Sequence, residues 1–233
     1  MNRSRIAGFS MALAALVAAG AAQAANLIVV EARGIALAPG TSVDPAKPLV
    51  LKQGQHVTLI SEQGATLSID GPYNQPPSAG GGGKSVGATL AALGTERNAR
   101  TGEAGVTRGA APNRLPTPWL FDVTRSGNVC LQEGQQPVFW RPDDKTSTSL
   151  VVMPVDRSWK SEASWPSGLD RLTVTTHVPM HGGAAYVVNY AGTEYALAVS
   201  TVPTSLDNDS MRVAWMVQKG CEAQAEALAR LGK

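Results

Sequence analysis

The feature that most constrains the fold is a series of short apolar segments, separated by turn sequences, that fills residues 119–202. Proline, glycine, aspartate and serine dominate the connections, and these residues favour turns. No helical segment lies between the apolar runs, so we expect antiparallel pairing rather than a parallel sheet with helical crossovers. The segments are WLFDVTR, NVCLQE, PVFWR, TSLVVMPV, DRLTVTTHV, AAYVVNY and EYALAVSTV. The sequence therefore predicts a mainly β protein whose C-terminal module, residues 119–233, is an antiparallel β-sandwich of immunoglobulin-like or related type.

Two local features complete this module. Ser126-Gly127 separates the first two segments and predicts a hairpin with Cys130 on its second strand. After residue 207, apolar residues recur every three or four positions, which predicts a terminal α-helix capped by Asn208 or Asp209. The apolar face of this helix consists of Val213, Val217, Cys221, Ala225 and Leu228.

The chain has two cysteines, Cys130 and Cys221. In an oxidising compartment an even number of cysteines indicates disulfide pairing, and two cysteines allow one intramolecular pair. A catalytic thiol and half of a metal site are the alternatives, but neither has a CxxC pair or a second ligand cluster to support it. We therefore expect a disulfide that joins the sheet to the terminal helix.

The N-terminus predicts export. Arg3 and Arg5 precede an apolar run over 6–22, and Ala22-Gln23-Ala24 provides small residues for cleavage. We expect a signal peptide over 1–24, cut before Ala25, a periplasmic location and no membrane span after cleavage. An uncleaved anchor is the alternative, but the run is short for a bilayer.

Loss of the signal peptide also changes the charge. The full chain has 20 basic and 18 acidic residues, and the signal contains two of the basic ones. The mature chain is therefore formally neutral, which gives it no electrostatic footprint for nucleic acid.

Residues 25–73 predict a separate small β module. Apolar or alternating runs such as HVTLIS are broken by turn sequences such as QGQ and EQG, which is typical of a small β-barrel or a sheet of four or five strands. The stretch LVLKQGQHVTLISEQGATLSIDGP resembles the FecR-type periplasmic domain of bacterial envelope signalling and assembly proteins. The resemblance covers residues 27–72 and implies a protein-binding envelope module without catalysis. The sequence leaves open whether the two β modules pack together.

The segment 74–118 is rich in proline and glycine and predicts a linker with one short helix. Within it, SAGGGGKSVGATLAALG resembles a phosphate-binding loop, because Lys84 and Ser85 end a glycine run. Ser78, however, occupies the position of the first glycine, and Pro76-Pro77 replaces the buried strand that such a loop must follow. We therefore expect no nucleotide binding.

Other candidate sites lie in the C-terminal module. Two imidazoles and a thioether, from His177, Met180 and His181, could hold copper, although a strand and turn do not bring them together by geometry alone. Trp159 and Trp165 lie in a turn-rich segment and are candidates for a binding surface, with core packing as the alternative.

No catalytic motif such as GxSxG or HExxH is present. The sequence thus predicts an exported, non-catalytic envelope protein without a cofactor, which binds an envelope protein or polymer and no nucleic acid or nucleotide. A periplasmic copper-binding protein is the first alternative, and a hydrolase using one of the histidines is the second.

Overall fold

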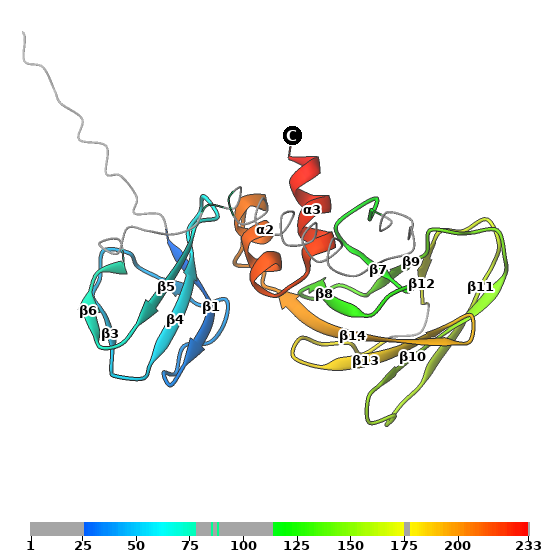
Figure 1. Ribbon diagram of the computed structural model, residues 1–233, viewed down its shortest axis with the longest axis horizontal. Helices are drawn as coiled ribbons and strands as arrows, with labels where there is room; N and C mark the ends of the chain where they lie inside the picture. Colours follow the sequence, from blue (N-terminus) through cyan, green and yellow to red (C-terminus); the bar gives the residue numbers. More distant parts are fainter. Residues whose placement is uncertain (1–25, 78–84, 86–87, 89–113, 175–177, 233) are drawn as a thin grey trace, which may run out of the picture.

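The computed structural model describes residues 26–77, 85, 88, 114–174 and 178–232. It is a mainly β fold in which two β modules lie on either side of a pair of C-terminal helices (Figure 1). The fold class predicted from the sequence is therefore confirmed. The predicted signal peptide, residues 1–24, lies outside the described residues.

The N-terminal module contains two small sheets. One has the strand order β2-β1-β4-β5, and the other pairs β3 with β6. Alternate residues of β1 and β4 face a core made of Leu27, Val29, Val57, Leu59 and their neighbours. The strands are β1 (Leu27–Arg33), β2 (Ser42–Val43), β3 (Leu49–Leu51), β4 (His56–Ile60), β5 (Thr66–Asp70) and β6 (Tyr73–Gln75).

The C-terminal module consists of a five-stranded sheet, β11-β10-β13-β14-β8, and a three-stranded sheet, β12-β9-β7. One hydrophobic core contains residues of both sheets, including Phe121, Phe139, Val188 and Leu197. The strands are β7 (Leu120–Asp122), β8 (Gly127–Gln132), β9 (Val138–Trp140), β10 (Thr148–Pro154), β11 (Ser161–Trp165), β12 (Arg171–Thr173), β13 (Ala185–Tyr190) and β14 (Thr193–Val202). Most pairs are antiparallel, but β8 runs parallel to β14 and β7 runs parallel to β9.

The hairpin predicted around Ser126-Gly127 is wrong, because β7 and β8 belong to different sheets. The Asp122 carboxylate accepts hydrogen bonds from the backbone N–H and hydroxyl of Thr124, at 2.9 and 2.6 Å, and pairs with Arg125 at 2.8 Å. These contacts turn the chain directly after β7, as aspartate side chains commonly do. The chain therefore leaves the first sheet before β8 begins.

The terminal helical segment is two helices rather than one, α2 (Asp209–Gln218) and α3 (Glu222–Leu231). The predicted cap is present, since the Asn208 side chain accepts a hydrogen bond from the Met211 N–H. Gly220 has φ of +72°, and its N–H and that of Cys221 donate to Val217 O and Met216 O. This is the pattern of a Schellman motif, which favours glycine and ends a helix.

The predicted disulfide is confirmed and joins Cys130 on β8 to Cys221 at the start of α3. Next to it, the buried Gln224 side chain accepts from Cys130 N–H at 2.6 Å and donates to Cys130 O at 2.8 Å. This amide uses both backbone polar groups of an edge-strand residue, which would otherwise be open to pairing. Helix α3 is thus fastened to β8 covalently and by hydrogen bonds.

Helix α2 packs against both modules, which answers the question that the sequence left open. Ile28, Val30 and Ile60 of the N-terminal sheet share one buried cluster with α2, α3 and Val202 of β14. Lys219, directly after α2, donates a hydrogen bond to Val30 O at 3.0 Å. The helix pair therefore joins the two β modules.

We expect replacement of both Cys130 and Cys221 by alanine to lower the free energy of unfolding by about 4 kcal/mol, because the disulfide closes a long loop in the unfolded chain. Urea unfolding at equilibrium measures the difference, and the unaltered protein under a reducing agent is the control. A loss of less than about 1 kcal/mol would show that chain entropy is not the main contribution.

Candidate functional site

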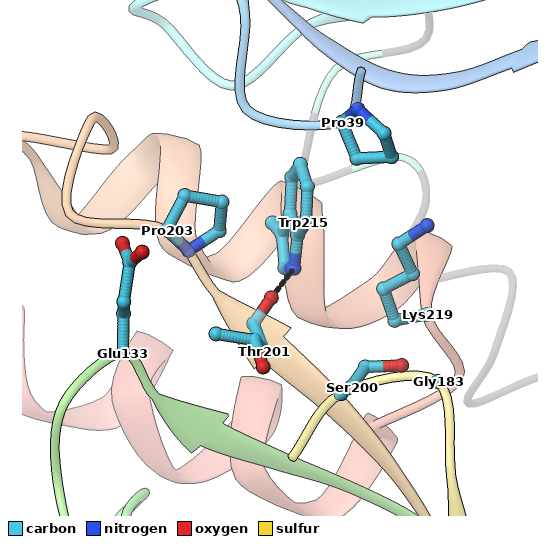
Figure 2. A pocket seen from close by; sticks show the side chains of 9 residues that line it. Pro39, Glu133, Gly183, Ser200, Thr201, Pro203, Trp215 and Lys219 are labelled. Carbon is cyan, nitrogen blue, oxygen red and sulfur yellow. Dashed lines mark hydrogen bonds between the residues drawn. The ribbon is translucent and has the colours of Figure 1, made fainter.

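The candidate site is a pocket of about 540 Å³ where the N-terminal module, β14 and α2 meet (Figure 2). We call it the junction pocket. Its size lies within the range of roughly 300–1,000 Å³ that is typical of ligand sites. The lining residues come from five separate segments of the chain and are Pro39, Glu133, Gly182, Gly183, Ser200, Thr201, Pro203, Trp215 and Lys219.

The floor of the junction pocket lies where the β13–β14 ladder ends. Strand β14 extends to Val202, whereas its partner β13 begins only at Ala185, opposite Ala198. Beyond that point, the Gly183 N–H donates to Val199 O and the Trp215 indole N–H donates to Thr201 O at 3.0 Å. The indole therefore replaces the bond that a longer β13 would have made.

Small residues keep this floor open. A Cβ on Gly182 would overlap the backbone and side chain of Thr201, so that position requires glycine. On the opposite side, Pro39 from the N-terminal module closes the pocket above Trp215 (Figure 2). The Ser205 hydroxyl donates to Gly40 O at 2.9 Å and holds this loop in place.

Two charged side chains lie on opposite sides of the indole (Figure 2). Glu133 is exposed, and its Oε2 accepts hydrogen bonds from the N–H and hydroxyl of Thr204 at 2.9 and 3.1 Å. Lys219 is half-buried, with its ammonium 5.2 Å from the centre of the Trp215 ring. The junction pocket therefore presents a carboxylate at one end and an ammonium at the other.

Lys219 is the group in the junction pocket whose charge is least compensated. Burial lowers the pKa of its ammonium below the ordinary lysine value, and the nearby Glu31 carboxylate opposes this shift. Glu31 itself is paired with Arg33 at 2.6 Å. Among the described residues, no carboxylate forms an ion pair with Lys219.

The lining residues can bind a ligand by charge, by hydroxyl hydrogen bonds and by apolar contact. Ser200 and Thr201 supply hydroxyl groups, but the nine lining residues include neither a histidine nor a cysteine. These groups can recognise a ligand that offers an anionic group, hydrogen-bonding groups and apolar surface.

Outside the junction pocket, the His56 imidazole lies between the side chains of Asp70 and Thr58. His56 Nδ1 lies 2.7 Å from Asp70 Oδ1, and His56 Nε2 lies 3.1 Å from the Thr58 hydroxyl. The order of groups is that of a hydroxyl nucleophile with its base and orienting carboxylate. Thr58 is only 6% exposed, however, and a nucleophile must reach its substrate. We therefore assign these three side chains a structural role between β4 and β5.

The structure does not bring the copper candidates together as far as it describes them. The Met180 side chain is buried in the core of the C-terminal module, whereas His181 is exposed and packs edge-on against Tyr186. His177 lies outside the described residues. Within the described ranges, no group of three or more His, Cys, Asp or Glu residues could hold a metal ion.

The two candidate tryptophans both pack on the core of the C-terminal module, to different extents. Trp165 is fully buried, its indole N–H donates to Leu169 O at 2.9 Å, and the Arg141 guanidinium lies 4.8 Å from its ring centre. Trp159 is partly buried and packs against the same core, next to Tyr186. Trp165 therefore follows the core-packing alternative, in which burial satisfies both the ring and its N–H.

The glycine-rich segment is largely outside the described residues, including Lys84. Its described part shows the Ser85 hydroxyl accepting a hydrogen bond from the Ala88 N–H at 3.2 Å, as expected of a helix cap.

No local sequence pattern predicts the junction pocket. Trp215 and Lys219 lie in a helical pattern that predicts packing, and Glu133 is the last residue of the predicted strand segment NVCLQE. The pocket forms because distant segments meet, and none of them carries a local motif.

No known protein family, curated protein or solved structure matches this chain significantly. In the part of the chain that the structure describes, no helix has both the length and the apolar character needed to cross a bilayer.

We expect no specific copper binding. Calorimetric titration of the purified chain with Cu(II) should give no saturable heat of one ion per chain, because the Met180 thioether lies in the core. His177→Ala and His181→Ala variants serve as controls. Stoichiometric binding that both variants abolish would contradict this prediction and favour copper handling.

Proposed function

We propose that the protein is an exported, non-catalytic binding module of the cell envelope that holds a protein or polymer at the junction pocket. The observation that carries the proposal is the pocket itself, which combines a half-buried cation, a carboxylate and hydroxyl groups between two modules. Ligand sites occur preferentially at such domain interfaces.

Two further observations support export and an envelope context. The Cys130–Cys221 disulfide is typical of proteins that fold outside the reducing cytoplasm. The N-terminal sequence has the arrangement of a signal peptide with cleavage before Ala25. The resemblance of residues 27–72 to the FecR-type periplasmic domain supports a partner in the envelope.

Site-specific photo-cross-linking in intact cells tests the proposal. A benzophenone amino acid at Pro39, which lines the pocket, should give a discrete adduct with one envelope component, because a bound partner contacts that position. The same substitution at Val155, which is 61% exposed and does not line the pocket, is the matched control. N-terminal sequencing should also find the chain beginning at Ala25.

The proposal fails if Pro39 and Val155 give the same adducts, or if neither gives any. It also fails if the chain is recovered from the cytosol with its N-terminus uncut. Mass spectrometry of the adduct distinguishes a protein partner from a polymer.

A further inference from the structure

We propose that the junction pocket binds a peptide segment through a carboxylate, with the Lys219 ammonium as its counter-ion. This inference rests on the proposed binding function and names the chemistry of the ligand. The carboxylate can belong to a chain terminus or to an acidic side chain.

The first argument is the charge of Lys219. A cation that is partly removed from water needs a compensating anion or hydrogen bonds. Lys219 donates one hydrogen bond, to Val30 O, and its ammonium group has three donors. Since no described carboxylate forms an ion pair with it, an anionic group from a ligand would complete its surroundings.

Glu31 does not supply this anion. Its carboxylate bonds Arg33 Nε at 2.6 Å, on the N-terminal sheet. Lys219 thus stays an available cation on the wall of the pocket, whereas the other described charges nearby are already paired or, like Glu133, bind backbone and hydroxyl donors.

The second argument is the shape of the pocket, which favours a peptide. The floor is the end of a β ladder, where β14 continues beyond β13 and the chain is held open by glycine at position 182. Pro39, Pro203 and the Trp215 ring provide apolar walls, and Ser200 and Thr201 line the pocket beside them. A short extended backbone offers both the apolar and the hydrogen-bonding groups that such walls accept.

A chemical-shift titration of the ¹⁵N-labelled chain, with its disulfide intact, tests the inference. The probes are acetyl-tetra-alanine with a free carboxylate, its C-terminal amide, and a matching amide with one alanine replaced by glutamate. We expect the two carboxylate peptides to shift the amides of Gly182, Gly183 and Ser200, and the neutral amide to leave them unchanged. Binding of the first peptide alone assigns the carboxylate to a chain terminus, and binding of both shows that an acidic side chain is sufficient.

Variants of the lysine locate the interaction. Lys219→Met should weaken carboxylate binding by about 10- to 100-fold, the range for a lost hydrogen bond to a charged group. Lys219→Arg keeps the charge and should retain most of the binding. Lys145→Met removes an exposed lysine in the β9–β10 loop and should have no effect. Should Lys219→Met fail to fold, the comparison of carboxylate with amide on the unaltered protein decides the question.

Any one of the following results would overturn the inference: equal binding of the amide and carboxylate peptides, unchanged binding in a folded Lys219→Met variant, or tighter binding of an oligogalacturonate than of any peptide. No peptide-induced shift at millimolar concentration would also overturn it. If cross-links from Pro39 persist in that case, the proposed binding function stands and only its carboxylate chemistry is wrong.

Discussion

Burial of helix α2 on more than one side is the constraint on which the rest of the structure depends. An isolated helix of ten residues is marginal in water, because nucleation is costly and few hydrogen bonds follow it. Here Met211, Val213, Ala214, Trp215 and Met216 are all buried, in one cluster with residues of both modules. The helix is therefore stabilised by the modules that it joins, and its position defines the junction pocket.

The same contacts explain why the pocket is polar at its edges and apolar in its middle. The Trp215 indole fills the space beyond the end of β13 and satisfies Thr201 O. Lys219 extends past the indole to Val30, so its aliphatic part packs while its ammonium lies at the pocket wall. A residue that links the modules is thus also the residue best placed to bind an anion. A Lys219 variant can lose both the contact with the N-terminal module and the binding of a ligand. Ligands that differ in charge are therefore compared on the unaltered protein as well.

Local patterns predicted most strands, because alternation and turn residues act over short distances. The strands β3, β4 and β5 lie within the stretch LVLKQGQHVTLISEQGATLSIDGP, and Asn208 caps the helix as expected. The predicted hairpin between β7 and β8 does not form, because the Asp122 side chain turns the chain directly after β7. The break at Gly220 had a visible signal, a glycine between a lysine and a cysteine, but the apolar spacing continued across it.

Local sequence patterns did not predict which polar side chains are buried. Arg141 is fully buried, and its guanidinium donates to the carbonyl oxygens of Thr146, Pro166 and Leu169, at 2.7–3.0 Å. In the sequence it is merely the charged end of a strand. Its role, like that of Lys219, depends on which carbonyl groups a distant loop presents, and no local spacing encodes this.

Native-state hydrogen exchange of Ile60→Ala tests most directly whether α2 depends on both modules. Ile60 is fully buried in the cluster that contains α2, and Ile→Ala substitutions in cores typically cost about 2–5 kcal/mol. We predict that amides of α2 and β4 exchange at least about tenfold faster, while those of β10 and β13 change less. Val50→Ala, at a position 59% exposed on the same module, should leave α2 unchanged. Equal protection of α2 in Ile60→Ala and the unaltered protein would show that α2 does not depend on the N-terminal module.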